Sequence, residues 1–428
     1  MNSVQGKKLL FLGAIRALIE PIEMAKSMGI RTIAIDYLPN SPAKNVADES
    51  YLISTTDIEA VVDFCRKEKV DGIFTAFTDS MLPYARKICD ILNLPFYASD
   101  EQIKLSLNKE YFKETCKMNG VPVPCDYTSE IKNKGIGNAN IRFPIIVKPT
   151  DSSGGRGIKV CYDKSQFDEA YEYALSVSPK KNVLVEEFVI GEEITATYTM
   201  KKGEISLSCV KDKLISKDHI NITSQSDVLI MPSRYLKLYK DTVDEKVKRM
   251  LKKMNATDGT VFFQGIVKDD RVVLFECGYR VNGACDYRHI ERENGINYMK
   301  MMISHSLTGE MLGYDLSMDN PFFSKYVLTF NMWAHGGKIG YQTGLDEVLK
   351  IDNVSFAEYM HEIGDVLIDN NTLAQRVFRA IIIDSDINKI KKTIQNIQNV
   401  VVINNSNNQN MLYNKFELDR LNEYNMET

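Results

Sequence analysis

The sequence predicts a multidomain protein of the α/β and α+β classes, with an N-terminal open parallel sheet, a central strand-rich region and a small C-terminal α+β region. Three observations predict it. Strand and helix patterns alternate over residues 7–100, strand and hairpin patterns dominate residues 141–210, and a strand–helix–strand pattern lies near the end. The 428 residues are enough for two to four domains.

The N-terminal alternation is typical of a parallel sheet covered by helices. Strand-like runs such as KKLLFLGA and RTIAID are separated by amphipathic segments, and PFYAS closes the series. Gly13 has no GxGxxG pattern around it, so a structural sheet is favoured over a dinucleotide site. We expect this domain to span residues 1–105.

The later boundaries follow from breaks in these patterns. Residues 101–120 have a helical pattern and VPVP at 121–124 is a break, so we place the first boundary near 105–125 and expect a second domain over 106–310. The third domain, 311–428, begins with SKYVLTFNMWAHGGKIGYQTG, which indicates a hairpin, and ends in an asparagine-rich tail expected to be only partly ordered. The basic segment 239–255 is interpreted as a solvated helix.

Composition argues against several classes of partner. The net charge of −4 gives no reason to expect nucleic acid or an anionic membrane, and no apolar run reaches the length of a membrane-spanning helix. Eight cysteines occur without a CxxC pair or an export signal, which favours reduced thiols. We expect a cytoplasmic protein that binds small molecules, with no nucleic acid and no membrane as partner.

The stretch KPTDSSGGRGIKV, residues 148–160, joins two strand-like runs through glycines and serines. It lacks the GxxxxGK[ST] order of a P-loop, because Lys148 precedes the glycines and a strand follows them. Backbone N–H groups in such a loop can surround phosphate oxygens, and Lys148 adds a positive charge. Taken alone, a plain glycine-rich connection is equally consistent with this stretch.

Two further segments favour a ligand. In the segment NVLVEEFVIGEEIT, residues 182–195, a strand-like run ends in acidic residues. This pattern is consistent with a hinge whose backbone contacts an adenine edge, with Glu193 accepting from ribose hydroxyls. An acidic surface turn is the alternative. In GTVFFQGIVKDDRVVLFECGYRVNG, a three-residue turn would put Gln264 opposite Glu276, and a two-residue turn would put them on opposite faces. A bound Mg²⁺ would neutralise Glu276, with Arg280 near the phosphate; a Glu276–Arg280 ion pair is the alternative.

In this order and spacing, these segments resemble the ATP-grasp superfamily. The resemblance covers about residues 7–400 and includes Asn108–Lys109, VPVP, FPIIVKP, the glycine loop, VEEFVIGEE and FECGYR. Within the superfamily, the chain looks like the stand-alone group labelled carbamoyl-phosphate synthase-like or phosphoribosylglycinamide synthetase-like. The resemblance implies a pre-ATP-grasp domain followed by an ATP-grasp fold, with a lid subdomain over about 125–190.

The resemblance also implies a site for ATP and Mg²⁺ or Mn²⁺. The ATP-binding positions are Lys109, Lys148, Ser152, Ser153, Gly154, Gly155, Gly157, Glu186, Glu187, Phe188, Val189 and Glu193. Of these, the lysines would contact phosphates, 152–157 would form the lid loop, 186–189 the adenine hinge, and Glu193 the ribose contact. Glu276 and Gln264 would be metal ligands, and Arg280 with Lys148 would be catalytic.

Two positions depart from the family pattern. An acid is usual where Gln264 stands, and an asparagine where Gly278 stands. Glutamine still offers a carbonyl oxygen to Mg²⁺, whereas glycine offers no side chain. Asn282 is a candidate replacement for the missing metal ligand, although its spacing from Glu276 does not show that it takes this place. Weaker metal binding, a reorganised site and lost catalysis are all open at this point.

The implied activity is an ATP-dependent ligase that joins a small carboxylate to an amine through an acyl-phosphate. A glycinamide ribonucleotide synthetase-type ligase and a nucleotide-binding protein that has lost turnover are the alternatives. Arg288, His289 and Arg292 are candidate contacts for a substrate carboxylate, although an ordinary charged helix is the favoured interpretation there. The resemblance leaves the oligomeric state open, with a homodimer common among relatives, and leaves the substrates unidentified.

Overall fold

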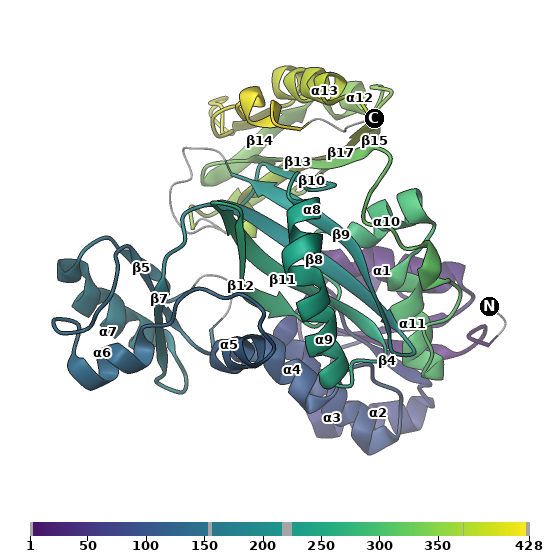
Figure 1. The fold of residues 1–428 in the computed structure, drawn as a ribbon. Coiled ribbons are helices and arrows are strands. Elements are labelled where there is room, and N and C mark those ends of the chain that lie inside the picture. Colours follow the sequence, from purple (N-terminus) through teal and green to yellow (C-terminus); the bar gives the residue numbers. More distant parts are fainter. Residues whose placement is uncertain (1–2, 153–155, 216–224, 371, 425–428) are drawn as a thin grey trace.

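The computed structural model describes residues 3–152, 156–215, 225–370 and 372–424. A large sheet runs through the middle of the molecule, the N-terminal sheet lies beside it, and a small sheet projects to one side (Figure 1). None of the described helices is both long and apolar enough to span a bilayer. The multidomain mixture of α/β and α+β structure is confirmed.

The N-terminal sheet has four parallel strands in the order β3-β2-β1-β4, as an open parallel sheet requires. Its strands are β1 Lys8–Leu12, β2 Arg31–Ile35, β3 Glu49–Tyr51 and β4 Gly72–Phe74. Its helices are α1 Ile19–Ser27, α2 Ile58–Glu68 and α3 Leu82–Leu92. PFYAS, which closes the predicted series, forms no strand, and the Tyr97 hydroxyl in it donates to the Tyr279 carbonyl at 2.9 Å.

The large sheet is antiparallel and has eight strands in the order β12-β11-β8-β9-β10-β13-β17-β15. Its strands are β8 Glu192–Lys201, β9 Glu204–Leu214, β10 Val228–Met231, β11 Gly259–Lys268, β12 Arg271–Gly278, β13 Tyr326–Trp333, β15 Val354–Tyr359 and β17 Arg376–Asp384. It therefore runs through the predicted 310/311 boundary, and the division of the chain into three domains stays a prediction.

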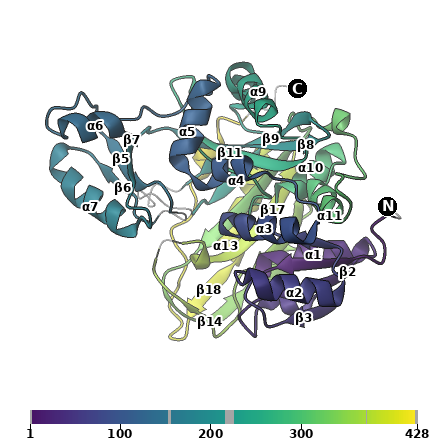
Figure 2. The ribbon, with the colours of Figure 1, turned by 90° about the horizontal axis from the view of Figure 1, so that it is seen from below.

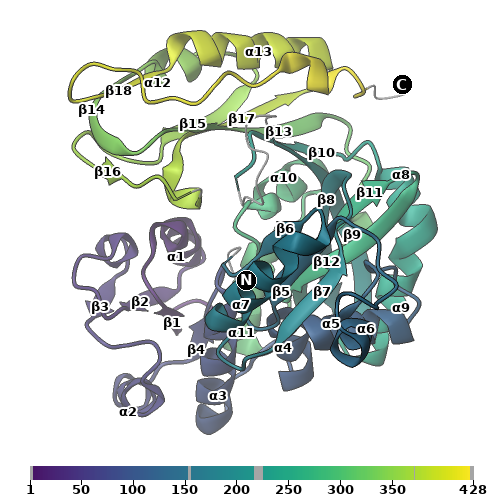
Figure 3. The same cartoon turned by 90° about the vertical axis from the view of Figure 1, so that its left-hand side faces the viewer.

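The small sheet has the order β6-β5-β7 and lies in front of β11 and β12 in Figure 3. Its elements are β5 Ile145–Pro149, β6 Lys159–Cys161, β7 Val183–Glu187, α6 Thr128–Lys134 and α7 Phe167–Val177. The loop of 148–160 joins two antiparallel strands, as expected. Helix α7 was not predicted, and Phe167, Ala170 and Ala174 on one of its faces are buried.

Helices cover the large sheet and separate it from the N-terminal sheet. They are α4 Asp100–Leu107, α5 Lys109–Met118, α8 Leu236–Tyr239, α9 Glu245–Lys253, α10 Asp286–Asn294 and α11 Tyr298–Thr308. The prediction that the helix over 239–255 is solvated does not hold for one of its faces. Val247, Met250 and Leu251 recur at helical spacing on that face and are fully buried. Methionines of α11 join the core of the N-terminal sheet.

The hairpin expected after residue 324 is also wrong. Strand β13 already pairs with β10 on one edge and β17 on the other, so the following strand has no free edge to join. It forms a separate sheet instead, with the strands β14 Gly337–Thr343, β16 Val366–Leu367 and β18 Val402–Asn405, beside α12 Leu345–Val348 and α13 Ile387–Val400. The strand–helix–strand pattern of β17, α13 and β18 is confirmed.

The C-terminal tail packs more closely than its composition predicts. Met411, Phe416, Leu421 and Tyr424 are buried in the C-terminal core, and the Tyr424 hydroxyl donates to the buried Asp212 carboxylate at 2.6 Å. The C-terminal strands and the N-terminal sheet lie side by side in Figures 2 and 3.

Candidate functional site

Two buried lysines meet one buried glutamate where helix α5 faces the small sheet. The Nζ atoms of Lys113 and Lys148 lie 2.7 and 2.9 Å from Glu186 Oε1, and Glu186 is fully buried. Burial lowers the pKa of Lys113, while Glu186 opposes that change. The triad carries one excess positive charge, which suits it to an anion such as a phosphate.

Lys109 stands at the first position of α5, where the Asn108 side chain accepts from the Tyr111 backbone N–H and begins the helix. Its Nζ donates to the Ser152 carbonyl at 2.7 Å and lies 3.9 Å from Glu276 Oε1. Burial lowers the pKa of Lys109, and Glu276 opposes this. One lysine thus links the glycine loop to the predicted metal ligand.

Half of the predicted loop can be placed. Ser153, Gly154 and Gly155 lie outside the described residues. Ser152 has a buried hydroxyl without a hydrogen-bond partner, and Gly157 has a φ of +80°, which glycine adopts without strain.

The predicted hinge divides into an inward and an outward part. Glu186 points at the two lysines, whereas Glu187 and Val189 line a cavity of about 190 Å³. The rest of its lining comes from the β11–β12 hairpin, namely Lys268, Asp269, Arg271 and Val273. The Phe188 backbone N–H donates to the Pro144 carbonyl. Two of the four predicted hinge residues thus lie at this cavity.

Glu193 begins β8 together with Glu192, and its Oε2 accepts from Lys213 Nζ at 2.8 Å. A ribose hydroxyl would share this carboxylate with Lys213.

The β11–β12 hairpin brings Gln264 opposite Glu276, by a route that neither expected turn describes. The turn has two residues, Asp269 and Asp270, both with positive φ, and Lys268 pairs with Arg271. Phe275 then bulges, so Gly265 pairs with Leu274 and Gln264 with Glu276. The bulge restores the shared face that a plain two-residue turn would remove.

The next cross-strand pair on the same face of the sheet is Phe262 opposite Gly278. A Cβ at Gly278 would lie 2.3 Å from Phe262 Cζ, so the ring fills the space of a side chain there. The Arg280 guanidinium lies over the same ring, with its Cζ 5.1 Å from the centroid. Arg280 also forms an ion pair with Asp79 of the N-terminal region, at 2.5 Å.

The donors at this hairpin fit one divalent cation. The Glu276 side chain is 38% exposed, so its carboxylate can reach an ion, and the Gln264 carbonyl lies on the same face. Asn282 is not such a ligand, because it is buried, its Oδ1 accepts from the Ala284 backbone N–H, and its Nδ2 donates to the buried Asp286 carboxylate. Among the described residues, no cluster of three or more His, Cys, Asp or Glu side chains is placed to hold a metal.

Two of the three candidate contacts on α10, Arg288 and His289, interact within the fold. Arg288 binds Glu20 through two nitrogens, with Nε donating at 2.7 Å. His289 is 2% exposed, and burial lowers its pKa to about 4. A neutral, buried imidazole offers no charge to a substrate carboxylate.

His289 predicts a pH-dependent stability. In the unfolded chain it gains a proton below about pH 6.5, whereas the folded chain resists protonation until about pH 4. The free energy of unfolding should therefore fall as the pH drops through this window. Urea unfolding of the His289→Gln variant should lose part of that dependence, whereas the exposed His335→Gln should keep it. Equal pH dependence in wild type and His289→Gln would refute this role.

Sequence analysis missed three residues of the site. Lys113 lies four residues after Lys109 on α5, a spacing that places both on one helix face. Phe262 lies two residues before Gln264 and so shares its strand face. Asp79 follows the carboxyl end of β4, and ligands bind at that edge of open parallel sheets, so its position in the sequence could have identified it as a site residue.

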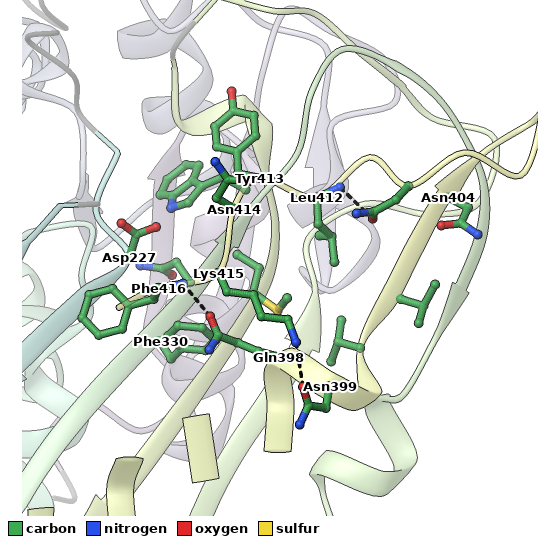
Figure 4. Close-up of a pocket in the computed structure, with 16 residues that line it drawn as sticks. Asp227, Phe330, Gln398, Asn399, Asn404, Leu412, Tyr413, Asn414, Lys415 and Phe416 are labelled. Carbon is green, nitrogen blue, oxygen red and sulfur yellow. Dashed lines mark hydrogen bonds between the residues drawn. The ribbon is translucent and has the colours of Figure 1, made fainter. Parts of the chain in front are cut away.

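A larger cavity, of about 250 Å³, lies between β13, α13, β18 and the tail (Figure 4). Amide and aromatic side chains line it, and Gln398 and Asn399 accept from the Phe416 backbone N–H and the Lys415 side chain. It includes none of the predicted site residues.

Two segments of the chain match models of known protein families. Residues 108–283 match the carbamoyl-phosphate synthase L chain ATP binding domain, and residues 9–88 match the PylC-like N-terminal domain. Formate-dependent phosphoribosylglycinamide formyltransferase from Sulfolobus acidocaldarius is 29% identical over 234 residues, covering 48% of this chain and 53% of that protein. The chain spans about half the length of the curated relatives it matches first.

Two solved structures share the fold over nearly the whole chain. Phosphoribosylglycinamide synthetase from Anaerococcus prevotii has a TM-score of 0.75 at 22% identity, covering 94% of this chain and 100% of its own. L-amino acid ligase from Bacillus licheniformis has a TM-score of 0.76 at 17% identity, covering 94% and 99%. The matched ATP-binding domain spans Lys109, Lys148, Glu276 and Arg280, and this part of the chain belongs to the ATP-grasp superfamily.

Proposed function

We propose that the chain is an ATP-dependent ligase that joins a small carboxylate to an amine and releases ADP and phosphate. One observation carries this proposal: Lys109 contacts both the glycine loop, at Ser152, and Glu276. Arg280 follows Glu276 by four residues. Cationic side chains and a metal-binding carboxylate thus meet at the loop, as phosphoryl transfer requires.

Each predicted residue has a role in this proposal. Lys109 and Lys148 bind the phosphates, residues 152–157 close over them, and Glu187–Val189 contact the base while Glu193 holds the ribose. The ion pair with Glu186 orients Lys148, and the excess positive charge of the Lys113–Lys148–Glu186 triad favours binding of the phosphate tail of ATP.

The reaction begins when an oxygen of the substrate carboxylate attacks the γ-phosphorus of ATP. The bond to ADP breaks, and an acyl-phosphate forms. The amine then attacks the acyl carbon, phosphate leaves, and the amine proton passes to solvent or a base. Lys148 and Arg280 stabilise the charge of the transferred group. A bound Mg²⁺ or Mn²⁺ at Glu276 would supply further charge neutralisation.

The proposed arrangement puts the reaction between three regions. They are the N-terminal sheet within residues 1–105, which contributes Asp79, the ATP site within residues 106–310 with its lid over 125–190, and the segment 278–295 that follows Glu276. Closure of the lid would exclude water, which would otherwise hydrolyse the acyl-phosphate. We further propose a cytoplasmic protein with small-molecule substrates and a homodimeric assembly.

A nucleotide-binding protein without turnover is the second candidate. The Phe262 ring over Gly278 favours it, because this ring fills a position that provides a metal ligand in the family pattern. The retained Lys148, Glu276 and Arg280 favour the ligase.

The test is ADP release from Mg-ATP, screened against pooled carboxylates and amines. A ligase requires a particular acid–amine pair, and Glu276→Ala and Lys148→Ala should both abolish the release. If ATP binds but no pool releases ADP with Mg²⁺ or Mn²⁺, the binding protein replaces the ligase as the function.

A further inference from the structure

The end of the β11–β12 hairpin carries two adjacent cross-strand pairs on one face. Gln264 lies opposite Glu276, and Phe262 lies opposite Gly278. Directly opposite side chains on one face of a sheet are in contact distance, so these four positions form one surface. In the family pattern, three of the four hold metal through oxygen atoms, whereas here only Glu276 is charged.

The ring of Phe262 has taken over the space at Gly278. It is 8% exposed, and an added Cβ at Gly278 would lie 2.3 and 2.4 Å from two of its atoms. Such a contact forces the ring to move, because real Cβ atoms do not approach other atoms so closely. Glycine at 278 and phenylalanine at 262 are therefore structurally coupled.

The same ring supports Arg280. The guanidinium carbon lies 5.1 Å from the ring centroid, within the range of a cation–π contact. The Arg280 side chain is 13% exposed, and its Nη2 contacts Asp79. A fixed positive charge thus stands over the place where an oxygen ligand is absent.

Oxygen donors at this surface suffice for one cation. Mg²⁺ takes one or two carboxylates together with substrate phosphates. Glu276 is the available carboxylate, Gln264 adds a neutral carbonyl, and Asp79 is held by Arg280. Lys109, 3.9 Å from Glu276, already supplies positive charge on the other side.

We propose that this chain binds its nucleotide with one divalent cation, held by Glu276 and Gln264, and that the Phe262 ring, which supports Arg280, fills the ligand position for a second. This inference rests on the proposed nucleotide site. It relates both departures from the family pattern to a missing second ion: the ring fills the space of a ligand at Gly278, and Gln264 brings no charge.

The test counts Mn²⁺ bound to the full chain in the presence of a non-hydrolysable β,γ-imido analogue of ATP. Free Mn²⁺ is measured by its electron paramagnetic resonance signal, so no turnover is needed. We expect one Mn²⁺ per nucleotide-bound chain and at least tenfold weaker Mn²⁺ binding in Glu276→Gln. Two ions per chain, or none, would overturn the inference while leaving the nucleotide site intact. Failure of the analogue to bind would instead overturn the proposed function.

Variants at the coupled pair test the role of the ring. Gly278→Asn alone should destabilise the protein and keep one ion, because the ring blocks the new side chain. The triple variant Phe262→Ala, Gln264→Glu, Gly278→Asn should gain a second ion. A second ion in Gly278→Asn alone would contradict the inference; if the triple variant does not fold, the wild-type count decides.

The Phe262→Leu variant distinguishes two roles of the Phe262 side chain, namely its volume over Gly278 and its aromatic contact with Arg280. Leucine keeps apolar volume over Gly278, so the count should stay at one ion. Loss of the cation–π contact should weaken analogue binding by about 3- to 30-fold. The Phe262→Tyr variant, which keeps the ring face, is the matched control and should bind within about twofold of wild type, because a tyrosine ring still holds a cation. Equal affinity in Phe262→Leu and wild type would show that the ring does not support Arg280.

Discussion

Replacing Glu276 with glutamine should lower ligase turnover by about 10²- to 10³-fold, the usual cost of removing one preorganised electrostatic group. The fold should be unchanged, because the Glu276 side chain is 38% exposed and its one ion pair, with Lys109, is long at 3.9 Å. Glutamine keeps the size of the side chain and removes the charge that attracts the cation. Steady-state ADP release at saturating substrates measures the effect.

The exposed Glu204→Gln on β9 is the control for the loss of a carboxylate elsewhere. It should retain full turnover. A Glu276→Gln enzyme as active as this control would show that Glu276 is not the metal ligand.

Replacing Glu186 with glutamine should be the most destabilising single change at the site. It leaves Lys113 and Lys148 buried without their shared carboxylate, and an uncompensated buried charge costs about 3–5 kcal/mol. Both lysines lie within 2.9 Å of one Glu186 oxygen, so one substitution removes both ion pairs. The free energy of unfolding in urea measures this loss.

The matched variant is Lys113→Met, which leaves Lys148 and Glu186 as a neutral pair. It should destabilise the protein less than Glu186→Gln, and the double variant should recover part of the loss in a double-mutant cycle. If Glu186→Gln is no more destabilising than Lys113→Met, the claim that the triad carries an excess positive charge is contradicted.

Local pattern predicted those parts of the fold whose partners are near in sequence. The parallel N-terminal sheet and the β17–α13–β18 unit follow from alternation and helical periodicity. The pairing of Gln264 with Glu276 was also among the predicted options. Its route through a two-residue turn and a bulge at Phe275 was not, because a bulge depends on packing on both strand faces.

The failures involve partners distant in sequence. β13 could not form the expected hairpin because β10 and β17, one before it and one after, occupy both its edges. Arg288 binds Glu20 across 268 positions, so its role as a fold contact could not be predicted from α10 alone. The ring of Phe262 over Gly278 likewise emerges only when β11 and β12 are paired.

The most direct test of the central claim follows oxygen from the substrate to the product. Pooled carboxylates labelled with ¹⁸O are incubated with Mg-ATP, amines and the full chain, and the released phosphate is analysed by ³¹P nuclear magnetic resonance. An acyl-phosphate intermediate transfers one carboxylate oxygen to phosphate, so the account predicts one ¹⁸O atom in each phosphate formed. Phosphate that is released without label would mean that water attacks ATP directly, and would contradict the ligase.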